Sequence, residues 1–327
     1  MIERLQKLDL RGAVLAVGLL ALLALPATGD VYITRLATRF LIYALAALSL
    51  DLILGYGGMV SFGHAMFLGI GMYVTGILFH HGITSAFIAW PAAIAATALI
   101  AAIVGALALR TSGVYFIMVT LAFGQMLYFF GVGLAPYGGD DGMPMPGRNT
   151  LGGLIDLRNQ AVFYYFVLAV LLITLTLACR LVNARFGTAI LGIASNERRM
   201  RALGFPTFRY KLACFVVAAV IAGIAGIFVA NQNNFISPAV MHWTQSGDLM
   251  VMVILGGAGT LFGAVVGAMV YLIMAEVLSG FTAHWLAVFG PALLLIVLFG
   301  KHGVYGLIPK RSLFGVRIRP RAEATAP

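Results

Sequence analysis

Residues 185–211 read RFGTAILGIASNERRMRALGFPTFRYK, a basic interruption in a chain that is otherwise strongly apolar. Six arginines and lysines lie in this stretch against one acid, Glu197. Apolar runs long enough to cross a bilayer flank it, so the positive-inside rule predicts that it lies in the cytoplasm. Its centre, residues 193–203, has the composition of a helix, and Gly204 and Pro206 end that helix. The stretch therefore predicts a short helix along the membrane surface, presented to a cytoplasmic partner.

The composition of the whole chain is that of a membrane protein. Of its 327 residues, 61% are hydrophobic and only 10% are charged, whereas soluble domains have about 25% charged residues. The 39 glycines suit close packing of helices in lipid and helices broken within the membrane. We therefore predict an all-α polytopic membrane protein with about 8–10 transmembrane helices, some of them broken at glycine.

The net charge of +10 does not indicate nucleic-acid binding. The basic residues concentrate in the 180–211 loop and in the C-terminal tail, with no interleaved aromatic platform, so they predict topology and contacts with anionic lipid. The two cysteines, Cys179 and Cys214, fall at cytoplasmic ends of expected spans. They have no metal-ligand spacing, so we expect no metal site and interpret them as buried apolar residues.

The apolar runs set the expected topology. Arg4, Lys7 and Arg11 place the N-terminus inside, and six crossings then return the chain to the cytoplasm at Arg185. A removable signal peptide is the alternative for residues 1–29, where an uncleaved first helix is the preferred interpretation. The acidic stretch 135–160 falls outside and the basic tail inside. The expected runs are 12–28, 36–54, 58–79, 83–109, 112–134, 161–182, 211–231, 248–278 and 284–300.

One of these runs must be broken if the basic tail is to lie on the cytoplasmic side. Nine spans would leave the basic tail outside, and the run 248–278 would be about 46 Å long at ~1.5 Å per residue, too long for a ~30 Å hydrocarbon core. The glycine cluster 256–260 supplies the break. A similar pattern occurs earlier, since LGYGG (54–58) leads to FGHA (62–65) as LGGAG (255–259) leads to FGA (262–264).

Two glycine-interrupted segments at corresponding places predict an internal repeat and a substrate path, because helix ends leave backbone groups that survive in a membrane only beside water or protein. Close packing of glycine is the competing interpretation. The residues expected to line the path are Gly55, Tyr56, Gly57, Gly58, Ser61, His64, Gly256, Gly257, Gly259 and Thr260.

Four ionisable residues stand in or near apolar runs, where charge is costly, so each is a functional candidate. Asp51 precedes the first glycine break and Asp248 begins the run that leads to the second. We expect Glu276 to reach the interface near a helix end and His64 to be a hydrogen-bonded packing residue. The chain contains no phosphate-binding GxxxxGK[ST] loop and no hydrolase or metalloprotease motif, so we predict a transport subunit that is not itself an enzyme and has no cofactor.

Several separated motifs, in order, resemble one family. LSLDLILGYGGMVSFGHAMFLGIGMY (48–73), GVYFIMVTLAFGQM (113–126), GGDDGM (138–143) and VILGGAGTLFGAVVGA (253–268) are similar to the permeases of branched-chain amino-acid ABC importers, the LivM type. The resemblance extends over residues 36–307 and implies one transmembrane permease domain, 1–310. That domain contains a cytoplasmic coupling loop, 183–210, and an extracytoplasmic loop, 135–160, and is followed by a basic cytoplasmic tail, 311–327.

The resemblance also implies partners and a location, the bacterial inner membrane. The partners are a second, LivH-like permease, two ABC ATPase subunits and an extracytoplasmic substrate-binding protein. Residues 192–204 resemble the segment that docks on the ATPase, except that Arg199 stands where alanine is common. The expected docking helix is 194–203, and the expected coupling residues are Ala194, Asn196, Glu197, Arg198, Arg199, Ala202, Leu203 and Gly204.

Two alternatives to a branched-chain or other hydrophobic amino-acid importer remain open at this point. Permeases for urea and short-chain amides share this architecture. A stand-alone ion-coupled secondary transporter belongs to another class and would need Asp51 and Asp248 as its ion carriers.

Overall fold

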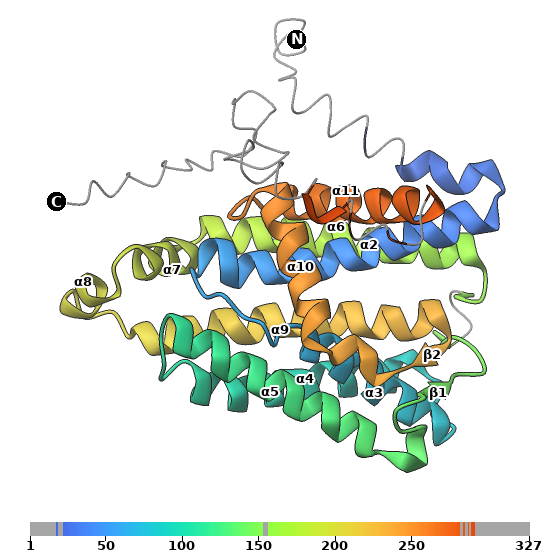
Figure 1. Ribbon diagram of the computed structural model, residues 1–327, viewed down its shortest axis with the longest axis horizontal. Helices are drawn as coiled ribbons and strands as arrows, with labels where there is room; N and C mark the ends of the chain where they lie inside the picture. The colour runs from blue at the N-terminus through green and yellow to red at the C-terminus, as the bar shows by residue number, and fades with distance from the viewer. Residues whose placement is uncertain are drawn as a thin grey trace, which may run out of the picture.

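The computed structural model describes residues 18, 22–152, 156–281, 284, 287 and 289–291, and the described chain is predominantly helical, as expected (Figure 1). The α-helices are α2 (Val31–Asp51), α3 (Ala65–His80), α4 (Ala86–Ala108), α5 (Val114–Gly133), α6 (Gln160–Asn183), α7 (Arg185–Ser195), α8 (Glu197–Ala202), α9 (Thr207–Asn233), α10 (Trp243–Gly256) and α11 (Leu261–Phe281). A π-helix, η2 (Leu52–Tyr56), extends α2, and short 3-10 helices are η1 (Leu25–Thr28), η3 (Ala135–Tyr137) and η4 (Pro238–Met241).

Six described helices are long and apolar enough to cross a membrane, namely Val31–Tyr56, α4, α5, α6, α9 and α11. They match expected runs, and α3 is a shorter apolar helix of 16 residues. The expected run 12–28 is only partly described, and most of 284–300 and all of the tail lie outside the described residues. The all-α polytopic fold is thus confirmed.

The predicted break in the run 248–278 is confirmed. Helix α10 ends at Gly256 and α11 begins at Leu261, and between them Gly257 and Gly259 adopt φ angles of 109° and 79°. L side chains rarely adopt such angles, so glycine is what allows the chain to turn here. Helix α10 begins at Trp243, earlier than expected, and its 14 residues give a length of about 21 Å, which is short of a full crossing.

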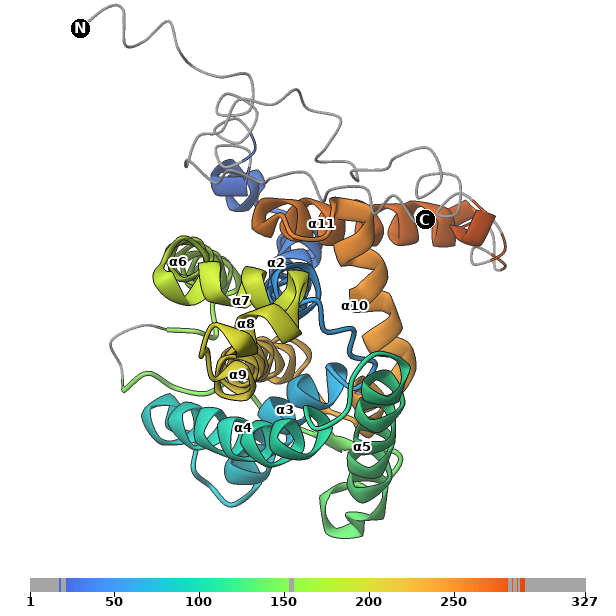
Figure 2. The ribbon, with the colours of Figure 1, turned by 90° about the vertical axis from the view of Figure 1, so that its left-hand side faces the viewer.

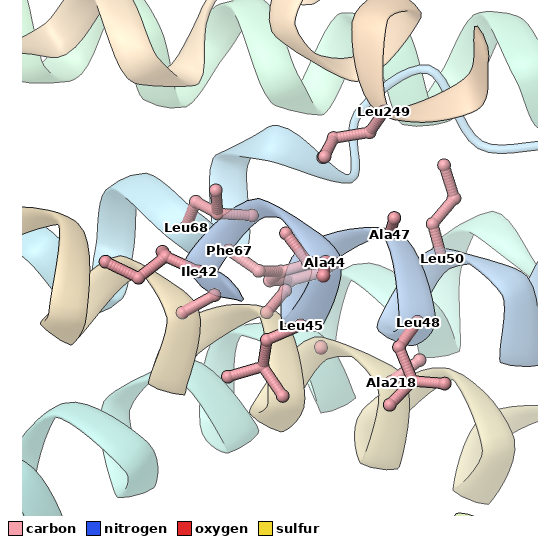
Figure 3. Packing of buried hydrophobic residues seen from close by; sticks show 14 of the residues in the cluster. Ile42, Ala44, Leu45, Ala47, Leu48, Leu50, Phe67, Leu68, Ala218 and Leu249 are labelled. Atoms are coloured by element: carbon pink, nitrogen blue, oxygen red, sulfur yellow. The ribbon is translucent and has the colours of Figure 1, made fainter. Parts of the chain in front are cut away.

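Helix α2 is the central helix of the bundle. It packs against α6, α9, α10 and α11, and in Figure 2 these helices surround it. Figure 3 shows its residues Ala44, Leu45 and Leu48 beside Phe67 of α3 and Ala218 of α9. Small side chains along α2 let several helices approach it at once, which is how helices associate in lipid.

Helices α3 and α9 cross at glycines. A Cβ added to Gly71 would lie 3.0 Å from the Cα of Gly223, and one added to Gly226 would lie 2.9 Å from the Cα of Leu68. The two backbones therefore touch, and larger side chains would force them apart. This contact fixes the short helix α3 in the bundle.

The two ends of the bundle differ (Figure 1). Helices α7 and α8 form one end. At the other end, β1 (Met143–Pro144) in the expected extracytoplasmic loop pairs antiparallel with β2 (Phe235–Ile236), which follows α9. Buried Arg148 holds the same loop by donating hydrogen bonds to the carbonyl oxygens of Asn231 (3.0 Å) and Leu157 (2.8 Å) and to the side chain of Gln160.

Candidate functional site

The basic stretch forms two helices, which corrects the expectation of one helix over 194–203. The chain breaks at Asn196, where φ is −157° and ψ is 96°, between α7 and α8. The Asn196 side chain accepts a hydrogen bond from the backbone N–H of Arg199 at 2.9 Å. Asparagine is among the best helix N-caps because its oxygen satisfies a free backbone donor, so Asn196 begins a new helix here.

Glu197 fastens α8 to the start of α9. Its carboxylate accepts hydrogen bonds from Arg201 (2.6 Å), from Thr207 (3.2 Å) and from the ammonium of Lys211. Burial disfavours its charged form, but these hydrogen bonds and the charge of Lys211 outweigh that effect and lower the pKa of Glu197. Among the eight expected coupling residues, Glu197 thus has a clear structural task, to hold α8 in place.

The other seven expected coupling residues are exposed. Leu203 is 66% exposed, and the apolar side chains of Leu191, Phe205 and Phe208 are exposed as well. Apolar residues exposed among arginines at a helix tip are typical of a surface that a partner covers. This end of the molecule therefore combines a helix held by hydrogen bonds with an exposed, partly apolar face.

The coupling stretch contacts the first glycine break. A Cβ added to Gly58 would lie 3.3 Å from the Cβ of Ala194, near the end of α7. Gly58 has a φ of 66°, a left-handed conformation that favours glycine. A movement of α7 would therefore act directly on the residues of the first glycine break.

The two glycine breaks, 204 residues apart in sequence at Gly55 and Gly259, lie against each other. A Cβ added to Gly55 would lie 2.6 Å from the Cα of Gly259. The Asp51 side chain accepts a hydrogen bond from the backbone N–H of Gly259 at 2.7 Å, and its other oxygen has no partner among the described residues. The structure thus brings together the two glycine-interrupted segments, which in the sequence are related only by a similar pattern of residues.

Most of the expected path residues are packed in the interior. Tyr56, Gly57, Ser61, His64, Gly256 and Gly257 are buried, Gly55, Gly259 and Thr260 are half-buried, and Gly58 is exposed. The ring of His64 bonds the Ser49 hydroxyl at 2.8 Å and meets Phe67 edge-on, which fits a packing role. In this arrangement the two breaks form a closed contact.

A cavity of about 250 Å³ lies elsewhere, between α2, α10 and α11, and none of the expected path residues lines it. Its wall includes Arg39, Asp248 and Glu276, and Tyr271 donates a hydrogen bond to Asp248 at 2.8 Å. Sequence reasoning singled out Asp248 and expected Glu276 to reach the interface, which fits its half-exposed side chain, but did not single out Arg39. The signal was present, since all three are charged residues inside expected apolar runs.

Comparison with known proteins shows the family of the chain. Residues 32–299 match the family described as branched-chain amino acid transport system / permease component. The chain is 27% identical to the high-affinity branched-chain amino acid transport permease LivM of Escherichia coli, over 88% of this chain and 74% of the relative. It is 26% identical to LivM of Salmonella typhimurium with the same coverage, and 24% identical to a probable LivM of Methanocaldococcus jannaschii, over 86% and 94%. No solved structure matches the chain significantly.

Proposed function

The chain belongs to the branched-chain amino-acid transport permease family, and from this premise we propose how its parts serve transport. It is a multi-pass membrane permease subunit of an ABC importer of branched-chain amino acids, and the urea, amide and ion-coupled alternatives are not favoured. As an ABC permease it works with ATPase and substrate-binding subunits, and it is not itself the catalytic part.

We propose that ATP is hydrolysed by two separate ABC subunits that dock on α7 and α8, and that a LivH-like permease completes the membrane unit. The observation that carries this proposal is the exposed face formed by Arg198 and Arg199 of α8 and by Leu203, which follows it. Glu197 anchors this helix to α9. A docking helix must be held in place by the rest of the protein, because a fixed helix transmits a displacement that a flexible loop would absorb.

The orientation belongs to the same proposal. The α7–α8 end faces the cytoplasm, as do both termini, and the β1–β2 end faces the outside. The basic character of 185–211 supports this assignment. The binding protein then delivers substrate to the β1–β2 end.

Two variants test the docking proposal. In a complex expressed with its ATPase and permease partners, the double variant Arg198→Glu with Arg199→Glu should reduce the ATPase that co-purifies with the chain and the uptake of labelled leucine. Arg158→Glu, an exposed arginine outside this loop, is the matched control. Full ATPase recovery with the double variant would refute docking at α8.

A further inference from the structure

The cavity between α2, α10 and α11 carries charges of both signs. Arg39 of α2 faces it, as do Asp248 of α10 and Glu276 of α11. Yet no ion pair within 4.0 Å joins the arginine to either acid among the described residues. The cavity is partly open, since Arg39 is exposed and Asp248 and Glu276 are half-buried. Unlike charges that share one cavity without touching leave room for a charged ligand between them, and charged residues within membrane segments are candidates for such a role.

The hydrogen bonds show which groups remain available. Glu276 already accepts from Tyr32 at 2.7 Å, at the rim where the start of α2 meets the end of α11. Asp248 accepts from Tyr271 with one oxygen, and its second oxygen has no hydrogen bond within the described part of the chain. Within that same part, the guanidinium of Arg39 has no hydrogen bond either, and lies 6.0 Å from the centre of the Tyr43 ring.

The remaining wall of the cavity is mixed. Phe40, Met252, Leu272 and Ala275 are apolar, and Tyr43, Gln245, Tyr271 and Ser279 carry polar atoms. Its volume of about 250 Å³ is below the ~300–1,000 Å³ of sites for drug-sized molecules, so the ligand must be small. One cation, an acid deeper in the cavity than Glu276 and several apolar side chains match a zwitterion with an apolar side chain.

Resting on the proposed function, we propose that the permease itself binds one free hydrophobic amino acid in this cavity. Arg39 holds the α-carboxylate, Asp248 holds the α-ammonium, and Phe40, Met252 and Leu272 contact the side chain. Arginine suits the first task because its planar fork pairs with both carboxylate oxygens. Tyr271 positions Asp248 by occupying one of its oxygens, which leaves the other for the ligand.

The position of the cavity agrees with its use. It lies on the first half of α2 and the last half of α11, while the closed Gly55–Gly259 contact joins the end of α2 to the loop before α11. The cavity thus lies on the β1–β2 side of the closed contact. An amino acid released by the binding protein would reach this cavity before it met the contact.

Direct binding to the purified complex, without binding protein, tests the proposal. Wild type should bind labelled leucine saturably, and should bind leucinamide and 4-methylpentanoate more weakly. Arg39→Gln and Asp248→Asn should each weaken leucine binding about 10- to 100-fold, the range expected for a charged hydrogen bond. Arg35→Gln, an exposed arginine one turn away that does not line the cavity, should bind as wild type does.

The analogues separate a binding role from a folding defect. Arg39→Gln should no longer distinguish leucine from leucinamide, which lacks the carboxylate. Asp248→Asn should no longer distinguish leucine from 4-methylpentanoate, which lacks the ammonium. If Glu276→Gln causes that second change in place of Asp248→Asn, the assignment of the ammonium partner is overturned.

The same experiment distinguishes failure of this inference from failure of the proposed function. Absence of binding-protein-dependent leucine uptake by the wild-type system would overturn the function itself. Normal uptake together with no saturable binding to the complex, or with variants that discriminate the analogues as wild type does, would overturn the site alone.

Discussion

Replacing Gly55 by alanine tests the closed contact between the two glycine breaks. The added Cβ would lie 2.6 Å from the Cα of Gly259, and ordinary contact begins at 3.4 Å, so the backbones must separate by at least about 0.8 Å, the difference of the two. The hydrogen bond from Gly259 to Asp51, now 2.7 Å, would stretch to its limit. Overpacking costs about 1–3 kcal/mol, and loss of a hydrogen bond to a carboxylate costs about 1.5–3 kcal/mol.

We therefore expect Gly55→Ala to lower the free energy of unfolding by about 2.5–6 kcal/mol, measured by denaturant titration of the purified protein in mixed micelles. Gly133→Ala is the matched control, because an added Cβ at this helical position meets nothing within 4 Å. Alanine there should be neutral or slightly stabilising, since it is the better helix former. Equal stability of the two variants would refute the contact.

Two further predictions concern the ends of the bundle. Arg148→Met should lower the free energy of unfolding by about 2–5 kcal/mol in the same titration, because it leaves buried carbonyl groups without a hydrogen-bond donor. The exposed control Arg158→Met should change the free energy of unfolding by less than about 0.5 kcal/mol. Equal losses in the two variants would contradict the role of Arg148. Because the pKa of Glu197 is lowered in the folded chain from its ordinary value of 4.5, the stability it adds is complete above that value and is lost as the pH falls through the lowered pKa. Protease resistance of the 185–211 loop should therefore be constant from neutral pH to about pH 5 and fall in more acidic buffer, and a Glu197→Gln variant should lack that fall; a drop of the same size in the variant would assign it to other groups.

The elements that composition controls were predictable, and the contacts between distant segments were not. The break at 256–260 follows from a length that no single span tolerates, and glycine is the residue that permits the turn. The division of the coupling stretch had a local signal as well, since Asn196 precedes an acid as an N-cap does. That signal was missed because alanines on both sides favoured one continuous helix.

Other features depend on tertiary packing, which a sequence pattern does not encode. The contact of Gly55 with Gly259 depends on how α2 crosses α11. The central place of α2 depends on which small residues face neighbouring helices at the same time. To predict the cavity, one must know that charged residues of three helices face one another. Two of these residues, Arg39 and Glu276, can each be explained as residues near a helix end.

The contacts on either side of Gly55 constrain any transport cycle that the proposed function requires. Ala194 of α7 meets Gly58, Gly55 meets Gly259, and α11, which lines the cavity, begins two residues later. The contact at Gly55 joins backbone to backbone beside the Asp51 carboxylate, so closely packed atoms must separate for it to open. Opening it breaks the hydrogen bond between Asp51 and Gly259 and costs about 1.5–3 kcal/mol. Under the proposed docking, a displacement of α7 would be applied at Gly58, three residues along the chain from Gly55, and would act on this contact directly.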